Sequence, residues 1–123
     1  MSEMTLDIST QIDDLRMLKD GWLEGQGQAP SKEGLDWLSQ AFDNYYPSDL
    51  PLPYLYPTEP GGVQVEWSLG RNEITLSIDL VEHSGHFHAL QMEDDTEETL
   101  RFDLGSEICW IALKNLITSK SEQ

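Results

Sequence analysis

The stretch that decides the fold is residues 63–79, Val-Gln-Val-Glu-Trp-Ser-Leu-Gly-Arg-Asn-Glu-Ile-Thr-Leu-Ser-Ile-Asp. Apolar and polar side chains alternate on both sides of Gly70-Arg71, which is the period of a half-buried β-strand. Glycine in the first central position is typical of a two-residue type II′ turn. The predicted hairpin therefore pairs Trp67 with Ile74, Val65 with Leu76, and Val63 with Ile78. A slip of one residue would move each strand's apolar side chains to the opposite face.

Three helices are predicted outside this hairpin, over residues 9–19, 31–45 and 106–118. Ser9 or Thr10 can cap the first, Ser31 the second and Ser106 the third. The third helix is the most apolar of the three, so we expect it to lie centrally on the sheet.

Three further strands are predicted. Residues 47–60 hold five of the six prolines and permit only a polyproline conformation or an edge strand, and we place an edge strand at residues 54–56. Residues 86–92 return from the hairpin after a turn around Gly85, and residues 99–104 alternate again. For 86–92 we favour the register that buries Leu90 and Met92; a different loop length would instead turn Phe87 and Ala89 inward.

These elements predict an α+β fold in which an antiparallel meander sheet of four to five strands carries three helices on one face. Residues 1–123 fit a single domain. We expect residues 1–7 and 119–123 to be frayed tails.

The composition is strongly acidic, with 23 Asp and Glu against 7 Lys and Arg and a formal net charge of −16. This charge repels nucleic acid and anionic membranes and favours a basic protein partner, although solubility alone is the better default explanation of such a charge. The single cysteine, Cys109, excludes an internal disulfide. The first residues show neither a basic segment nor an apolar one, so we expect no secretory signal and a cytoplasmic protein.

Candidate chemistry is sparse. His83, His86 and His88 lie within six residues, but no second ligand cluster accompanies them, and a tight turn does not bring the three together. No nucleophile elbow is present, and Cys109 lies within an apolar helix stripe. We therefore predict no catalytic residues, no cofactor and no metal.

A candidate binding surface is more specific. Tyr54 and Tyr56 alternate with Leu55 between prolines, so either the tyrosine pair or the leucine must be exposed. Large amphipathic rings on a proline-stiffened edge are typical of protein-recognition surfaces, whereas an aromatic lid packed under the loop is the alternative. The predicted partner-binding residues are Tyr46, Tyr54, Tyr56, Glu93, Asp94, Asp95, Glu97 and Glu98, the last five in an acidic loop.

Residues 21–38 and 46–80, above all Gly21–Pro30, Pro51–Pro57 and Gly61–Ser68, resemble a set of short uncharacterised bacterial proteins. The resemblance implies a bacterial cytoplasmic protein and brings no catalytic residues.

Together these features predict a non-enzymatic, acidic protein-interaction module of an accessory, immunity or antitoxin-like kind. A nucleic-acid mimic that blocks a DNA- or RNA-binding protein is the alternative, and a small-molecule-binding or hydrolytic role is the third. The oligomeric state stays open, a homodimer included.

Overall fold

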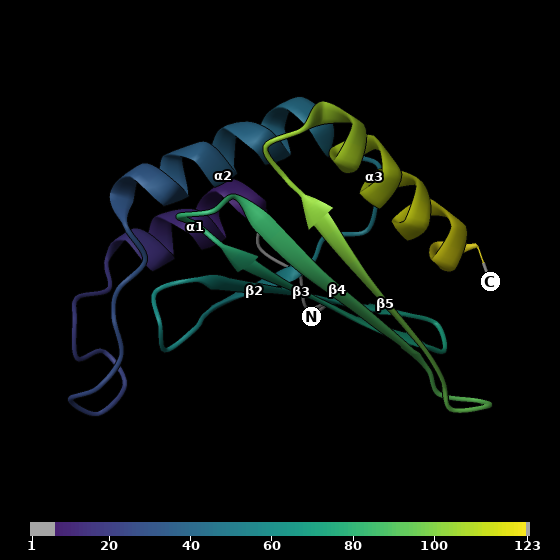
Figure 1. Ribbon diagram of the computed structural model, residues 1–123, viewed down its shortest axis with the longest axis horizontal. Coiled ribbons are helices and arrows are strands. Elements are labelled where there is room, and N and C mark those ends of the chain that lie inside the picture. The colour runs from purple at the N-terminus through teal and green to yellow at the C-terminus, as the bar shows by residue number, and fades with distance from the viewer. Residues whose placement is uncertain (1–6, 123) are drawn as a thin grey trace, which may run out of the picture.

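The computed structural model describes residues 7–122 of the chain. Its elements are α1 (Ile8–Arg16), α2 (Lys32–Tyr45), β1 (Tyr54–Pro57), β2 (Val63–Leu69), β3 (Asn72–Asp79), β4 (Ser84–Gln91), β5 (Thr96–Asp103) and α3 (Glu107–Ser121). The strands form one antiparallel sheet in the order β1-β2-β3-β4-β5, and the helices cover one of its faces (Figure 1). The predicted α+β meander with three helices on one face is confirmed.

The β2–β3 hairpin has the predicted register. Trp67 lies opposite Ile74, Leu69 opposite Asn72, and Gly70 takes a positive φ of 60° in the turn. The inward side chains of both strands are buried beneath the helices. Alternation and turn chemistry therefore act together, and the hairpin forms the centre of the core.

The favoured register of the next strand was wrong. Ile78 lies opposite Gly85 rather than Leu90, so β4 turns Phe87 and Ala89 inward. Both side chains are buried, whereas Met92 is 57% exposed just beyond the strand.

The reason for this register is the space at Gly85. A Cβ atom added there would lie 2.8 Å from Leu104 Cδ1 and 2.9 Å from Leu76 Cδ1. The two leucines therefore fill an inward position that carries no side chain, and only a glycine fits between them.

The helix ends differ from the prediction in several places. α1 ends at Arg16 rather than at Lys19, and Ser106 precedes α3 as predicted but its side chain makes no cap hydrogen bond. Asp7, rather than Ser9 or Thr10, caps α1, since its Oδ1 accepts a hydrogen bond from the Thr10 N–H at 2.7 Å. Ser31 caps α2 as predicted, accepting from the Gly34 N–H at 3.0 Å. α3 continues to Ser121, so much of the predicted C-terminal tail is helical. Except for Asp7, the predicted N-terminal tail lies outside the described residues.

The central helix is α2, not α3. Figure 1 shows α2 between α1 and α3, with α3 on the β5 side of the sheet. α3 buries Trp110, Leu113 and Ile117, but its Ile108 is 77% exposed and its Ile111 44% exposed. Apolar content alone thus misplaced this helix, because part of that content faces solvent. None of the helices within residues 7–122 is long and apolar enough to cross a membrane.

Candidate protein-interaction surface

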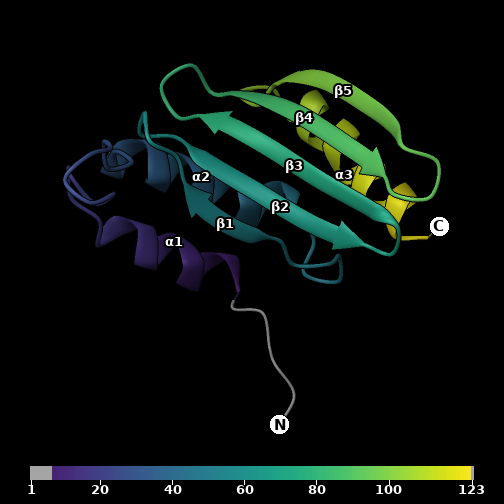
Figure 2. The same cartoon turned by 90° about the horizontal axis from the view of Figure 1, so that it is seen from below.

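The face of the sheet opposite the helices is bare. Figure 2 shows the strands in front of α2 and α3, with α1 alongside β1 and no described segment crossing the strands. The strand registers align the outward side chains in rows across the sheet. One row holds Tyr54, Glu66, Thr75, His88 and Thr99, and the next holds Tyr56, Gln64, Ser77, His86 and Arg101. We call this face the outer face.

Tyr54 and Tyr56 both lie on the outer face, at its β1 side. They are 51% and 45% exposed, whereas Leu55 between them is 8% exposed and packs into the core. Their strand neighbours on β2 are Glu66 and Gln64. The structure thus exposes the tyrosine pair rather than folding it into an aromatic lid, and it sets a carboxylate beside one ring.

Tyr46 does not belong to this surface. It is 7% exposed, its hydroxyl donates to the Pro51 carbonyl, and the same oxygen accepts a hydrogen bond from Trp67 Nε1 at 2.9 Å. Burial raises the pKa of the Tyr46 hydroxyl to about 12, outweighing the opposite effect of the Trp67 hydrogen bond. A ring that is held in the core by two hydrogen bonds is not accessible to a partner, which contradicts the prediction of Tyr46 as a partner-binding residue.

The acidic run is not one loop. Glu97 and Glu98 belong to β5, where Glu97 points to the outer face and Glu98 to the helix side. Glu97 Oε1 lies 3.7 Å from His88 Nε2, and Glu98 Oε1 lies 3.2 Å from Lys120 Nζ. A nucleic-acid mimic would need carboxylates repeating along one ridge, and these two face opposite ways.

The turn before β5 uses its own carboxylates. Glu93 forms an ion pair with Arg71, and Asp94 accepts hydrogen bonds from the Thr96 hydroxyl at 2.7 Å and the Thr96 N–H at 3.1 Å. The hydroxyl, followed by the N–H, lowers the pKa of the Asp94 carboxyl. Asp95 takes a positive φ of 59°. These acids remain exposed, but Glu93 and Asp94 also shape the turn.

The three histidines do not form one cluster, because they lie on different sides of the sheet. The His83 ring stacks on Trp37 with centroids 3.9 Å apart, on the helix side, while His86 and His88 lie on the outer face. Within residues 7–122 no group of His, Cys, Asp and Glu is arranged to hold a metal ion.

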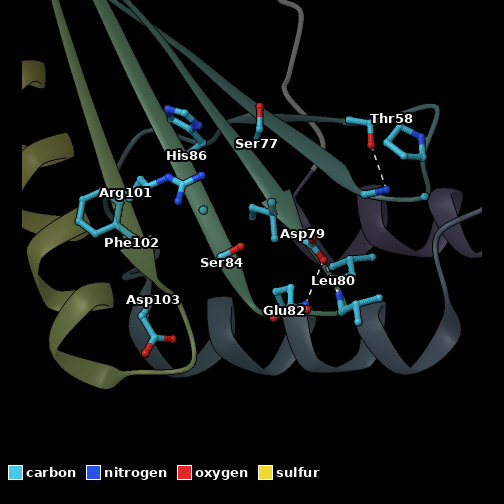
Figure 3. A pocket seen from close by; sticks show the side chains of 16 residues that line it. Thr58, Ser77, Asp79, Leu80, Glu82, Ser84, His86, Arg101, Phe102 and Asp103 are labelled. Atoms are coloured by element: carbon cyan, nitrogen blue, oxygen red, sulfur yellow. Dashed lines mark hydrogen bonds between the residues drawn. The ribbon is translucent and has the colours of Figure 1, made fainter.

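A hollow of about 1180 Å³ lies where β3, β4 and β5 meet the turns at one end of the outer face (Figure 3). Asp79 in its lining accepts from the N–H groups of Val81 at 2.9 Å and Glu82 at 3.0 Å, so it holds the β3–β4 turn. Asp103 likewise accepts from the Gly105 N–H at 3.1 Å. Both carboxylates are therefore engaged in turns.

The remaining polar lining of the hollow includes His86 and Arg101, directly opposite each other on β4 and β5 (Figure 3). Within residues 7–122, neither Ser77 nor Ser84 of the lining is hydrogen-bonded to His86. Sequence reasoning did not consider Arg101 for this face. The sequence did contain a signal for it: Arg101 lies between the apolar Leu100 and Phe102, and this alternation predicts that its side chain points to the opposite face.

A scan of protein-family models found no match to the chain, and searches of curated proteins and of solved structures found no similar protein.

Proposed function

We propose that this chain is a non-enzymatic protein-interaction module that binds a basic protein partner through the β1 side of its outer face. The observation that carries the proposal is the exposure of Tyr54 and Tyr56, side by side on a bare sheet face and anchored by the buried Leu55. An accessory, immunity or antitoxin-like role in a bacterial cytoplasm fits such a module.

Two tyrosines on a strand make an effective contact. Each ring offers a large apolar surface with a polar end and loses little side-chain entropy on binding, so aromatic residues supply much of the energy of protein interfaces. β1 is pre-ordered here, because Pro53 and Pro57 flank the pair and the Pro53 carbonyl accepts a hydrogen bond from Gln11 at 2.9 Å. A partner would therefore meet a surface that is already in place.

The surrounding charge favours a basic partner. Glu66 lies beside Tyr54, and Glu73 is an exposed carboxylate further along the same face. With a net charge of −16, the chain attracts a cationic surface from a distance, which speeds association more than it deepens affinity.

The test is a pull-down from host lysate with the tagged chain, read by quantitative mass spectrometry. The double substitution Tyr54→Ala and Tyr56→Ala should reduce capture of a basic protein at least about tenfold, because aromatic anchors commonly contribute 2 kcal/mol or more each. The melting temperature should stay nearly unchanged, since both rings are about half exposed. Val81→Ala is the matched control, because Val81 is 85% exposed and lies in the turn between β3 and β4 rather than on β1.

Equal capture by the double variant and the Val81→Ala control would remove the tyrosines from the interface. Loss of the cooperative melt in the double variant would assign both rings to the core and would also contradict the proposal.

A further inference from the structure

The two edges of the sheet differ in how their outward backbone groups are satisfied. Along β1 the Gln11 side chain takes the place of a neighbouring strand, since its Nε2 donates to the Pro53 carbonyl and its Oε1 accepts from the Leu55 N–H at 2.8 Å. β5 is the last strand at the opposite edge, and no described segment pairs with its far side. It is eight residues long, holds no proline and pairs with β4 without a break in register. An edge of this kind is a template for another strand.

The backbone direction along this edge follows from one hydrogen bond. The Leu104 N–H donates to the His83 carbonyl at 2.8 Å, so residues 83 and 104 form a hydrogen-bonded pair just beyond the ends of β4 and β5. Hydrogen-bonded and non-hydrogen-bonded pairs alternate along an antiparallel ladder. The N–H and C=O groups of Glu97, Thr99 and Arg101 therefore point away from β4, towards the open edge.

We propose that a second copy of this chain pairs with β5 in antiparallel orientation, centred on Thr99, to form a two-fold symmetric dimer with a continuous ten-stranded sheet. In this register Glu97 of each copy lies opposite Arg101 of the other, on the outer face. A two-fold interface needs such self-complementarity, and the strand has it because Glu97 and Arg101 flank Thr99 at equal spacing.

Charge excludes the neighbouring registers. Antiparallel registers that pair outward groups with outward groups differ by steps of one residue in the symmetry centre. Because β5 spans residues 96–103, at least five residues of each strand overlap only when the centre lies between residues 98 and 101. A centre at residue 98 sets Glu98 against Glu98 of the second copy, and a centre at Leu100 sets Glu97 against Asp103. A centre at Arg101 sets two guanidinium groups together. Like charges directly opposite each other destabilise strand pairing. The register centred on Thr99 sets no like charges opposite each other within β5, because its one such combination, Asp95 with Asp103, involves a residue of the turn before the strand. Thr99 therefore remains as the centre.

The helix side of β5 is compatible with this pairing. In the Thr99-centred register Glu98 lies opposite Leu100 of the second copy and keeps its own ion pair with Lys120, at 3.2 Å. Leu100 on the same side is 38% exposed, and the Thr99-centred register places it diagonally from Leu100 of the second copy, within reach of a side-chain contact. Pairing would thus cover an apolar side chain that the single chain leaves in water.

A different protein could also add a strand here. The symmetry of charge about Thr99 favours a second copy, because a foreign strand has no need of an edge that is complementary to itself. The backbone hydrogen bonds supply affinity, and the facing charges select the register. This dimer is independent of the tyrosine surface at the opposite edge, so either proposal can fail alone.

The test is sedimentation equilibrium of the full chain over a dilution series at physiological salt. The unmodified chain should show a mass twice the 14.0 kDa of one chain, and should dissociate on dilution. Arg101→Glu and Glu97→Arg should each weaken the dimer at least about tenfold, because each sets like charges opposite each other twice. Combining both changes restores opposite charges in the same register and should recover the dimer.

Two control variants separate strand pairing at β5 from general effects on folding and charge. Thr99→Pro removes an outward N–H without breaking a bond to β4, so the variant should keep its circular-dichroism melt and sediment as a monomer. Glu73→Arg makes the same reversal of one charge on β3 and should leave the dimer intact.

Hydrogen exchange locates the interface: the amides of Glu97, Thr99 and Arg101 should be protected in the dimer. In the Thr99→Pro variant, which has no amide N–H at residue 99, the amides of Glu97 and Arg101 should exchange freely. A chain that is monomeric at every dilution would overturn the proposal. So would a dimer that ignores both charge reversals, or one that the double swap does not restore.

Discussion

The two lateral strands of this sheet show two ways of ending a sheet. β1 is only four residues long and is closed by a side chain from α1, whereas β5 is eight residues long and left open. Exposed strand edges invite pairing with other chains, and proteins usually shorten, cover or charge them. This chain shortens and covers one edge and places charges along the other. At the β1 edge, Gln11 therefore satisfies backbone groups from within the same chain. At the β5 edge, the charged side chains limit which strand can pair there.

The difference continues behind the strands. Behind β1 the Tyr46 hydroxyl connects the Pro51 carbonyl with Trp67 Nε1, and the side chains of Tyr46 and Trp67 are both buried. Behind β5 the corresponding link is the ion pair of Glu98 with Lys120, whose side chains are 46% and 15% exposed. Buried, satisfied polar groups are costly to disturb and exposed ion pairs are not. The β1 side should therefore be the more sensitive of the two to substitution.

The largest effect is expected from breaking the closed edge. Gln11→Ala leaves the Pro53 carbonyl and the Leu55 N–H without their partner in a buried place, which costs about 1–3 kcal/mol for each group. We expect the free energy of unfolding to fall by roughly 2–5 kcal/mol in urea titrations, with an unchanged slope. Gln40→Ala on the exposed face of α2 is the matched control and should change stability by less than about 0.5 kcal/mol.

Gln11→Glu refines this test. A carboxylate can accept from the Leu55 N–H but cannot donate to the Pro53 carbonyl, and its charge would be buried against that oxygen. At neutral pH the variant should therefore be no more stable than Gln11→Ala. If Gln11→Ala were as stable as the Gln40→Ala control, water would replace the glutamine at no cost and the contrast between the two edges would disappear.

Sequence reasoning reached the outward tyrosines and the hairpin because each rests on local rules. The alternation around Leu55 required an exposed and a buried side, and Gly70-Arg71 fixed the β2–β3 register. Gln11 was missed, although a signal existed: it lies three residues after Ile8 and four before Leu15, on the apolar stripe of α1. A polar residue on such a stripe needs a buried hydrogen-bond partner. For Gln11 that partner is the Pro53 carbonyl, which is more than forty residues away in the sequence.

The β4 register was missed for a different reason. Counting buried apolar side chains favoured Leu90 and Met92, but the inward position at Gly85 is filled by Leu76 and by Leu104, which follows β5. The alternation of apolar and polar residues within one strand does not show that side chains from distant segments fill such a space. The same limit applies to Glu97 and Glu98, because a run of acids does not show that two of its members belong to a strand and face opposite ways.

A smaller effect is expected behind the closed edge. Tyr46→Phe removes one hydroxyl and leaves Trp67 Nε1 without its acceptor, which should lower the free energy of unfolding by about 1–3 kcal/mol at neutral pH. Tyr45→Phe is the control, because that neighbouring ring is only half-buried and its hydroxyl has no hydrogen bond within the described residues. A loss as small as the control's would show that the Tyr46 hydroxyl does not hold the strand.

The same hydroxyl predicts a pH dependence. Burial raises the Tyr46 pKa from 10.0 to about 12, so below pH 10 the group is neutral in both the folded and the unfolded chain. As the pH rises from 10 to about 12 the unfolded chain ionises first, and stability on the order of 2 kcal/mol is lost. Tyr46→Phe lacks this loss, so its urea stability should approach that of the wild type over this range. Parallel curves would contradict the prediction.

The smallest effect is expected at the open edge. Glu98→Gln removes the carboxylate that faces Lys120 while keeping the shape of the side chain. Partly exposed ion pairs contribute about 0.2–1 kcal/mol, so a double-mutant cycle with Lys120→Met should return a coupling energy of that size. The cycle is best measured in the Thr99→Pro background, where strand pairing between copies cannot contribute. A coupling above about 2 kcal/mol would equal the cost of a buried hydrogen bond. The two sides of the sheet would then be held equally firmly, and the difference between them would lie only in the backbone groups that β5 leaves open.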